Sequence, residues 1–545
     1  MSEIDSLVNA IEGLSIRPTL MPHQIKALDF IDRIEKRAPG ERSGIRGGFL
    51  SMEMGMGKTL TMLQQIQRTK VPGQAPTLVL CPKTAMYTWK NEIQKFFPGD
   101  LHACVFRKEE IKVDLMSRAA LSNYDIVITN YDYIRSLATK MELKKKVQIT
   151  KPRGEGEAVV GANAAPGCLL NDDRGEGILF SIRWHRIVAD ESHAFSNMST
   201  ALAQSMLCLA ADLKWCVTGT PIRNWATDLY SQFKFLGLKD SSFSKGGFDQ
   251  LGFKNFMHSA TYDSEKIKLP DVSHQKIPVT LDTRNTEIYK MYLEQACEAY
   301  DDFVCGTTTF DCVLVAFLRL RQACVAPFIV TPDLTKKDKD FIEKYQESQR
   351  GLQLTTKGLS IWINQEDGTA GKLAPKVQKT IEIIKGTPPG EKVIVFSMFK
   401  RALKLAAAGC EFSHVHLNGD ITGEARAHAL DNFKTGDAKV MFANYKVGAE
   451  SLNLTEANHI ILMEPWWCPA VIEQAKARIQ RLGQTKSTYI YELCIANLEQ
   501  KTNIEENILK LCESKKESAK NFFTTGAITG REGLDARAIG RILER

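Results

Sequence analysis

Two stretches of the chain alternate short apolar runs with helical patterns, and this alternation constrains the fold more than any other feature. The first stretch covers residues 45–238 and the second begins near residue 390. Runs separated by helices imply parallel sheets with both faces covered, because each connection must cross back over the sheet. The strand-like runs are residues 47–50, 77–81, 125–129, 184–189, 215–218, 392–396, 414–417, 439–442, 459–462 and 489–493. The sequence therefore predicts an α/β protein with two doubly wound parallel-sheet lobes.

The length of the chain agrees with two large lobes and additional segments. At 545 residues it is too long for one core, because a domain usually takes roughly 100 to 200 residues. We expect an N-terminal lobe over residues 1–240, with a flexible, glycine-rich insertion at about 150–178. A helical connector follows over 241–380. The C-terminal lobe covers 381–512, and a polar tail covers 513–545.

Charge and composition restrict the classes of function. The formal charge of +7, from 71 basic and 64 acidic residues, permits a polyanionic partner without requiring one. The 13 cysteines never form a C-x-x-C pair, so the ligand spacing of zinc ribbons is missing. No run approaches the roughly 20 apolar residues that cross a bilayer. We expect a soluble intracellular protein with no membrane partner.

A glycine-containing loop predicts a phosphate-binding site. Residues 52–59 read Met-Glu-Met-Gly-Met-Gly-Lys-Thr, between the strand-like run 47–50 and the helical pattern 60–66. Such a loop turns backbone N–H groups and a helix N-terminus toward an anion, and Gly55 and Gly57 let the main chain close around phosphate. The usual pattern has glycine where this chain has Met52, and short Gly-Lys-Thr strings also occur by chance in loops.

The loop residues expected to bind nucleotide have distinct roles. Lys58 would neutralise the β- and γ-phosphates, and the Thr59 hydroxyl would be a ligand of magnesium. The predicted nucleotide-binding residues of the loop are Met54, Gly55, Met56, Gly57, Lys58, Thr59 and Leu60.

An acidic pair strengthens the prediction of a nucleotide site. Asp190 and Glu191 directly follow the apolar run 184–189. Ligands of parallel α/β sheets bind at the carboxyl ends of the strands. Asp190 can hold the magnesium, and Glu191 can orient and deprotonate the attacking water, as phosphoryl transfer requires. Taken alone, two acids in this position would also fit a solvated strand end.

Two arginines suggest the other half of the site. Residues 469–483 begin with proline and end with glycine, which predicts a helix. Gln474, Arg478 and Arg481 are then spaced i, i+4 and i+7 on one stripe. The stripe could be a solvated or DNA-facing surface. Alternatively, the arginines stabilise the transition-state charge of a triphosphate on the other lobe, in a split site that works when the lobes close.

Together these residues and the segments around them resemble the Swi/Snf-type ATPases, the double-stranded-DNA translocases of helicase superfamily two. The resemblance runs in order from about residue 20 to residue 510. The matching segments are residues 20–24, 51–59, 81–98, 129–131, 190–193, 218–224, 318–324, 393–397, 417–419, 448–454, 464–469 and 474–484. The chain departs from the family pattern at Met52, Ala449, Ser451 and Cys468.

The resemblance assigns roles to individual residues. It implies RecA-like lobes that bind ATP and Mg²⁺, with Gln24 in contact with adenine. His193 would couple the nucleotide to the segment 218–224, and Arg478 and Arg481 would be arginine fingers. The residues implied as catalytic are Lys58, Asp190, Glu191, Arg478 and Arg481, and those implied for the metal are Thr59 and Asp190.

The resemblance also implies a function, with alternatives. The leading expectation is a monomeric DNA-dependent ATPase that moves along double-stranded DNA and remodels protein–DNA complexes, in the nucleus or in a viral replication compartment. DNA-bound proteins or transcription and repair machinery would be further partners. The alternatives are a strand-separating DNA or RNA helicase and a hydrolysis-poor DNA-binding scaffold. Trp466 and Trp467 could stack on unpaired bases, but we expect them to pack at the lobe interface.

Overall fold

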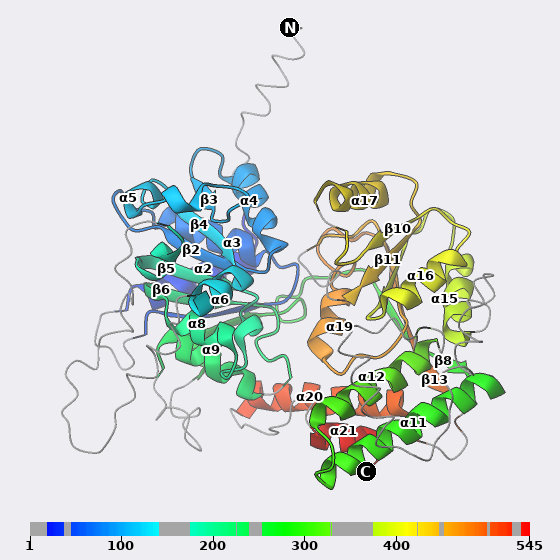
Figure 1. Ribbon diagram of the computed structural model, residues 1–545. Coiled ribbons are helices and arrows are strands. Elements are labelled where there is room, and N and C mark those ends of the chain that lie inside the picture. The colour runs from blue at the N-terminus through cyan, green and yellow to red at the C-terminus, as the bar shows by residue number, and fades with distance from the viewer. Residues whose placement is uncertain are drawn as a thin grey trace. The chain divides into compact units, whose positions relative to one another are not determined.

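The structure is a computed structural model, and Figure 1 shows its helices and strands. It describes residues 19–37, 45–140, 175–224, 226–238, 253–326, 329, 374–421, 423–445, 452–496, 498, 502–525 and 536–544. The chain divides into two compact units. The first unit comprises Met1–Lys268 and Glu517–Arg531, and the second comprises Leu269–Lys516 and Glu532–Arg545.

The first unit is built on a seven-stranded sheet in which every neighbouring pair of strands is parallel. In sheet order the strands are β3 (Ala103–Val105), β4 (Ile126–Asn130), β2 (Thr77–Cys81), β5 (Arg183–Asp190), β6 (Ala210–Val217), β1 (Gly47–Met52) and β7 (Met257–Ala260). All residues of β1, β2 and β4 are buried, as expected for strands covered on both faces. The carboxyl ends of β1, β6 and β5 are therefore neighbours along one edge.

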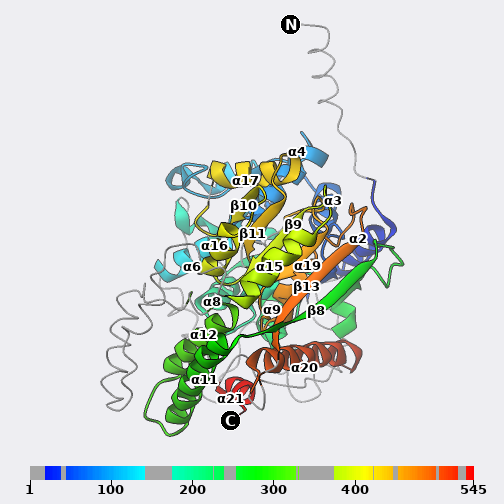
Figure 2. The same cartoon turned by 90° about the vertical axis from the view of Figure 1, so that its right-hand side faces the viewer.

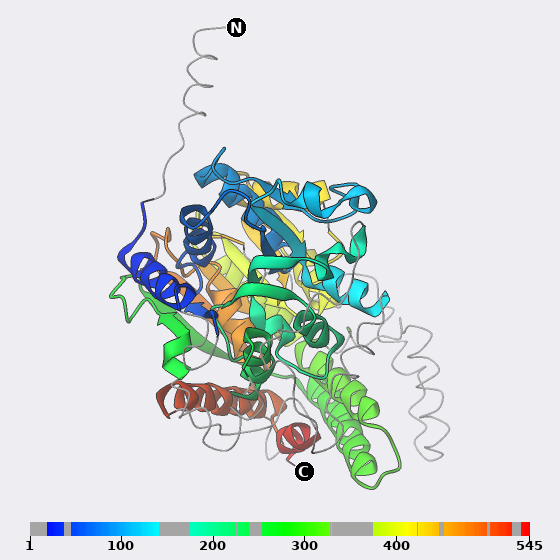
Figure 3. The ribbon, with the colours of Figure 1, turned by 90° about the vertical axis from the view of Figure 1, so that its left-hand side faces the viewer.

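Two groups of helices cover this sheet (Figure 3). One group contains α2 (Pro22–Glu35), α3 (Lys58–Arg68) and α4 (Ala85–Phe96), in which α3 contacts both other helices. The other contains α6 (Tyr131–Lys140), α8 (Ala201–Leu207) and α9 (Leu229–Leu236), in which α8 contacts both others. Right-handed crossovers place the groups on opposite faces, because the connections run in opposite directions along the sheet. The short elements are η1 (Val113–Leu115), α5 (Arg118–Leu121), η2 (Glu176–Phe180), η3 (Ser192–Phe195), η4 (Ala226–Asp228) and η6 (Phe253–Phe256).

The second unit contains a six-stranded sheet whose neighbouring strands are also parallel. In sheet order these are β10 (His414–Leu417), β11 (Val440–Asn444), β9 (Val393–Ser397), β12 (His459–Leu462), β13 (Thr488–Ala496) and β8 (Val272–Thr280). Its helices are α11 (Thr283–Val304), α12 (Phe310–Val325), α15 (Pro375–Gly386), α16 (Lys400–Ala408), α17 (Gly423–Thr435), α19 (Pro469–Lys476), α21 (Ala536–Leu543) and the part of α20 (Ile504–Thr525) that ends at Lys516. Figure 2 shows β13 and β8 side by side.

Alternate strand residues of the second unit enter two different hydrophobic clusters. In β9, Val393 and Val395 pack with α15 and α16, whereas Ile394 and Phe396 pack with α17 and α19. This alternation follows from the period of two along a strand, so both faces of the sheet are covered. The predicted α/β class with two doubly wound parallel-sheet lobes is therefore confirmed.

The segment expected as a helical connector, residues 241–380, is more varied than predicted. It contains α11 and α12 as expected, but β7 joins the first sheet and β8 joins the second. The division at Lys268 consequently falls inside this segment. Most of the expected insertion at 150–178 lies outside the described residues. Among the residues that are described, no helix combines the length and apolar character needed to cross a membrane.

Candidate nucleotide site

The loop after β1 contains two glycines with left-handed backbone conformation. Gly55 and Gly57 have φ angles of 84° and 78°, and α3 begins immediately afterwards, at Lys58. This left-handed region favours glycine. A Cβ atom on Gly57 would also overlap the side-chain amide of Gln24. Glycine is therefore required at Gly57 for conformational and for steric reasons.

The ammonium group of Lys58 lies at the end of β1. Its Nζ donates to the carbonyl oxygens of Met52 at 2.9 Å and Glu53 at 3.2 Å. A Cβ atom built on Gly219, which follows β6, would lie 3.3 Å from this Nζ and 3.1 Å from Cγ of Met54. The segment after β6 is thus packed directly against the phosphate loop.

The N-terminus of α2 is bonded to the same loop. His23 Nε2 lies 2.9 Å from the carbonyl oxygen of Met56, and both His23 and Gln24 are buried. Gln24 accepts a hydrogen bond from the backbone N–H of Met21 at 2.8 Å, and its Nε2 lies 3.5 Å from the carbonyl oxygen of Gly57. The structure therefore places the residue predicted to contact adenine beside the phosphate loop.

Asp190 ends β5 as a buried carboxyl group. Its Oδ2 accepts a hydrogen bond from Trp89 Nε1 at 2.9 Å, and its Oδ1 accepts one from the N–H of Glu191 at 3.0 Å. Burial, together with the charge of Glu191, raises the pKa of Asp190 to about 7, although the Trp89 hydrogen bond and the charge of Lys58 act in the opposite direction. A cation beside this buried carboxyl group would favour its ionised form and lower its pKa.

The Asp190 carboxylate and a threonine hydroxyl are suitable ligands for magnesium. Mg²⁺ prefers oxygen ligands and usually takes only one or two carboxylates from the protein. Thr59 supplies a hydroxyl in the first turn of α3, and Asp190 supplies the carboxylate at the end of β5. The residues present therefore fit the metal that the sequence predicts.

Glu191 and His193 are linked through a threonine of the next strand end. The Thr218 hydroxyl lies 3.3 Å from Glu191 Oε2 and 3.2 Å from His193 Nδ1. His193 Nδ1 lies 3.3 Å from the same carboxylate oxygen. Glu191 itself has a φ angle of 53°, an uncommon value for a non-glycine residue that marks a constrained position. The acid predicted to activate water is thus bonded to the segment that contacts Lys58.

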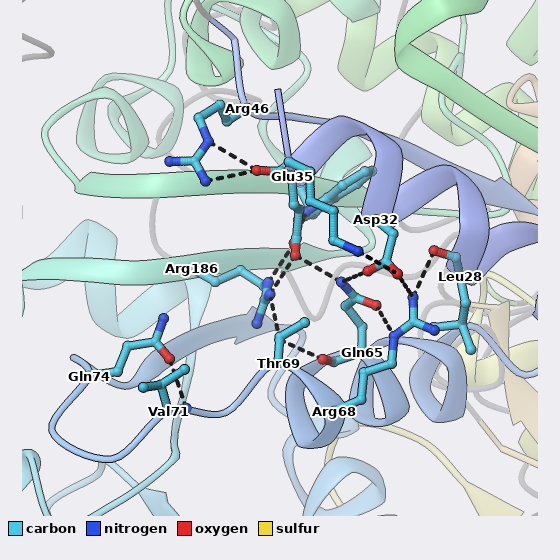
Figure 4. Close-up of polar contacts among 12 residues, drawn as sticks. Leu28, Asp32, Glu35, Arg46, Gln65, Arg68, Thr69, Val71, Gln74 and Arg186 are labelled. Carbon is cyan, nitrogen blue, oxygen red and sulfur yellow. Dashed lines mark hydrogen bonds and ion pairs between the residues drawn. The ribbon is translucent and has the colours of Figure 1, made fainter. Parts of the chain in front are cut away.

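A buried polar network joins the elements that carry these residues (Figure 4). Arg186 of β5 makes two hydrogen bonds to Glu35 of α2, from Nε at 2.8 Å and from a terminal nitrogen at 2.7 Å. The same carboxylate accepts from Gln65 Nε2 of α3 and Trp215 Nε1 of β6, both at 2.8 Å. All four side chains are buried. The network therefore fixes α2, α3, β5 and β6 relative to one another.

The predicted arginine stripe is not continuous helix. Instead of extending to residue 483, α19 ends at Lys476 and the chain continues in turns. The physical reason is local: Arg478 Nε donates to the carbonyl oxygen of Gln474 at 3.0 Å, which satisfies a terminal carbonyl of the helix. Arg478 and Arg481 nevertheless converge, because each donates to the carbonyl oxygen of Leu452, at 3.2 and 3.1 Å. The neighbouring positions Ala449 and Ser451 lie outside the described residues.

The tryptophan pair has a packing role inside the second unit. Trp466 and Trp467 stack with ring centroids 3.8 Å apart, and the buried Arg321 guanidinium lies 4.7 and 4.5 Å from their centroids. Their carbonyl oxygens accept hydrogen bonds from α20, Trp466 from Cys512 Sγ at 3.0 Å and Trp467 from Lys515 Nζ at 2.8 Å. These contacts hold the pair in place.

Comparison with known proteins agrees with the motif resemblance. Residues 23–251 match the family model of the SNF2-related domain, and residues 375–483 match that of the helicase conserved C-terminal domain. The putative helicase 172L of Invertebrate iridescent virus 6 is 31% identical, over 92% of this chain and 90% of that protein. The chain belongs to the Swi/Snf-type ATPases. As a member of this family it is a DNA-dependent ATPase.

Three further proteins are similar to this chain at lower identity. The probable global transactivator of Orgyia pseudotsugata multicapsid polyhedrosis virus is 25% identical, over 92% of this chain and 90% of that protein. The DNA repair protein RAD5A of Arabidopsis thaliana is 26% identical over 87% of this chain, which spans 52% of that protein. The solved SWI2/SNF2 ATPase core of Sulfolobus solfataricus in complex with dsDNA has 21% identity and a TM-score of 0.37, covering 97% of this chain and 98% of that chain.

Several contacts of this Swi/Snf-type site could not be read from the sequence. Trp89 falls within a matching segment, but it is 101 positions away from its partner Asp190. Glu35 and Arg186 are similarly separated by 151 positions. Arg186, a basic residue inside the buried run 184–189, was the one sequence signal for this ion pair, since a charge buried in a strand needs a partner.

Proposed function

We propose that this chain is an ATP-dependent double-stranded-DNA translocase, which couples ATP hydrolysis to movement on DNA and to remodelling of protein–DNA complexes in transcription, repair or chromatin. The observation that supports this best is the connection from Glu191 through Thr218 to Gly219, which lies against Lys58. It joins the residue suited to activate water to the residue suited to bind the reacting phosphates. Such a connection allows hydrolysis and conformational change to be coupled.

Each candidate site residue of the first unit has its own role in this proposal. Backbone N–H groups of the loop and of the first turn of α3 bind the phosphates, and Lys58 neutralises their charge. Glu191 orients the attacking water and accepts its proton. Thr59 and Asp190 would hold Mg²⁺, which when bound supplies neutralisation of phosphate charge. Gln24 would contact adenine.

The arginines of the second unit complete the proposed site. Arg478 and Arg481 would stabilise the charge that develops on the transferred phosphoryl group, as arginine fingers do. Their convergence on the carbonyl oxygen of Leu452 supports a joint role. In this proposal hydrolysis requires both units, and DNA bound across them would stimulate it.

Double-stranded DNA is the partner that we propose. Relatives of the chain include a DNA repair protein and a chromatin-remodeling complex ATPase. Phosphate contacts should dominate, because they hold register without reading bases, so the affinity for DNA should fall steeply with salt. We also propose that the protein is a monomer inside the cell, in the nucleus or in a viral replication compartment, where it meets DNA-bound proteins.

A phosphate-release assay with duplex DNA, single-stranded DNA and RNA tests this proposal. Duplex DNA is expected to stimulate ATP hydrolysis. Translocation is measured separately, as displacement of the third strand from a DNA triplex. Unwinding of a forked substrate would instead indicate a strand-separating helicase. Absence of turnover with every nucleic acid would indicate a DNA-binding scaffold.

Two substitutions test the active site itself. Lys58→Ala and Glu191→Gln are each expected to lower duplex-stimulated hydrolysis by about 100-fold or more, because phosphate charge or proton acceptance is lost. The matched controls are Lys36→Ala and Glu109→Gln, whose side chains are 78% and 68% exposed. Turnover near that of the wild type in either active-site variant would refute the assignment.

A further inference from the structure

The end of β7 and the segment that follows it are bonded to the phosphate loop at three points. The strand β7 pairs with β1, with Ala260 beside Met52, and the N–H of Glu53 donates to the carbonyl oxygen of Ala260 at 2.8 Å. Tyr262, which is 7% exposed, donates its N–H to Glu53 Oε2 and its hydroxyl to the carbonyl oxygen of Met54, both at 2.8 Å. The tyrosine is therefore bonded to two successive residues of the loop, to the Glu53 side chain through its backbone N–H and to the Met54 carbonyl through its hydroxyl.

The hydroxyl contact controls the direction of one peptide group. In a planar trans peptide the C=O and the following N–H point in opposite directions. A carbonyl of Met54 fixed toward Tyr262 therefore turns the N–H of Gly55 to the opposite side. The restraint matters at this peptide because glycine tolerates both signs of φ, so that the peptide before Gly55 could flip easily and present an oxygen to an anion.

Other carbonyls of the loop are held in a similar way. Those of Met52 and Glu53 accept from Lys58 Nζ, that of Met56 contacts His23, and that of Gly57 accepts from the Thr61 hydroxyl at 3.0 Å. Met54 is the loop position at which this restraint comes from Tyr262, more than 200 positions away in the sequence.

We propose that Tyr262 is a positioning residue of the phosphate loop, which keeps the Met54–Gly55 peptide oriented so that its N–H can bind a phosphate oxygen. Glu53 supports it by holding the Tyr262 backbone. The inference rests on the proposed nucleotide site, and Tyr262 lies outside the segments that match the family. The residue acts before the chemical step, so its removal weakens phosphate binding and leaves the turnover of bound ATP nearly unchanged.

Tyr262→Phe tests this inference because it removes one oxygen and leaves the ring in place. The expected result is a three- to tenfold higher Kd for a fluorescent ADP analogue, the net value of about one hydrogen bond. The inhibition constant of inorganic pyrophosphate should rise by the same factor, since pyrophosphate has no base and reports on the loop alone. The kcat at saturating ATP should stay within about twofold of the wild type.

A matched control separates positioning from general packing. Tyr289 is buried in the second unit and its hydroxyl donates to the carbonyl oxygen of Thr502 at 2.5 Å, so Tyr289→Phe loses a comparable bond. It should leave both constants unchanged. Glu53→Ala should reproduce part of the loss, and Glu53→Gln should not, because glutamine retains an acceptor for the Tyr262 N–H.

The outcomes distinguish this inference from the proposed function. Unchanged ADP and pyrophosphate constants in Tyr262→Phe, in a protein whose wild type hydrolyses ATP, would overturn the positioning role. A three- to tenfold lower kcat at an unchanged Kd for the ADP analogue would also overturn it. A wild type that neither binds nor hydrolyses ATP would refute the proposed function instead.

Discussion

Asp190 is the residue at which burial and the proposed function act in opposite directions. Burial raises the pKa of its carboxyl group to about 7, whereas a magnesium ligand must be ionised. The indole N–H of Trp89 opposes the effect of burial because it donates to the ionised form. The tryptophan therefore keeps the carboxylate available near neutral pH.

Trp89→Phe should shift the pH profile of hydrolysis. Loss of the donor raises the pKa of Asp190 further, so a larger fraction of the carboxyl group is protonated at a given pH below or near neutrality. We expect the acid limb of the profile at limiting Mg²⁺ to move to higher pH, with activity at pH 6.5 falling more than activity at pH 8.5. Rates measured across this range, with several Mg²⁺ concentrations, check the result.

Trp184→Phe is the control for this experiment. The Trp184 indole is also buried, but its N–H donates to the carbonyl oxygen of Leu179 at 3.1 Å instead of to Asp190. Its acid limb should coincide with that of the wild type. Identical shifts in both variants would indicate a general loss of packing and contradict the specific role of Trp89.

At the scale of single elements, the buried strands were the most predictable part of the molecule. The apolar runs at 77–81 and 459–462 coincide with β2 and β12, because a strand covered on both faces reads as a short continuous apolar run. Edge strand β8 was not predicted. Most of its residues are exposed, it contains Pro278, and its pairing with β13 cannot be read from its own sequence.

Helix ends were less predictable than strands for a related reason. The proline and glycine that bracket residues 469–483 predicted the start of α19 correctly and its end wrongly. The end depends on the Arg478 side chain, which takes the place of a backbone donor. The candidate site followed the same rule: local motifs identified the residues that meet nucleotide, whereas long-range partners such as Trp89 and Tyr262 required the fold.

The Glu35 network should dominate the stability of the first unit. The charge of Arg186 and hydrogen bonds from Arg186, Gln65 and Trp215 outweigh the effect of burial and lower the pKa of Glu35. A lowered pKa means that the stabilisation is present above the ordinary glutamate value and is lost as the pH falls through the folded value. Glu35→Ala should cost about 3–5 kcal/mol of unfolding free energy, because Arg186 would remain buried without its carboxylate.

Urea unfolding at neutral pH measures this loss. Asp32→Ala is the control, since Asp32 bonds to Gln65 and Arg68 in the same network but its side chain is 27% exposed; its cost should be about 1 kcal/mol or less. Replacing Glu35 and Arg186 together by methionine should recover much of the stability. Equal costs for Glu35→Ala and Asp32→Ala would contradict the central position of Glu35.

At the scale of the whole molecule, the proposed motor needs side chains from two units that fold around separate sheets. Arg478→Ala and Arg481→Ala should each lower duplex-stimulated hydrolysis by about 10³-fold, the usual effect of removing an arginine finger. Binding of a fluorescent ADP analogue should be unchanged, because the phosphate loop belongs to the first unit.

Thermal unfolding and a surface control complete this comparison. Both arginines also bond to the Leu452 carbonyl, so each variant must retain its unfolding transition for its kinetics to be interpreted. Lys385→Ala, with a side chain 48% exposed, should leave hydrolysis unchanged. Near wild-type hydrolysis in either arginine variant would remove that guanidinium from the proposed mechanism.

The position of β8 determines how the second unit can be produced alone. The match to the helicase C-terminal model begins at residue 375, yet β8 lies at Val272–Thr280 and pairs along its entire length with β13. A recombinant fragment started at residue 375 would leave the hydrogen-bonding groups of β13 open to strands of other molecules, which favours aggregation. A fragment intended for crystallisation or binding studies should therefore start no later than Leu269.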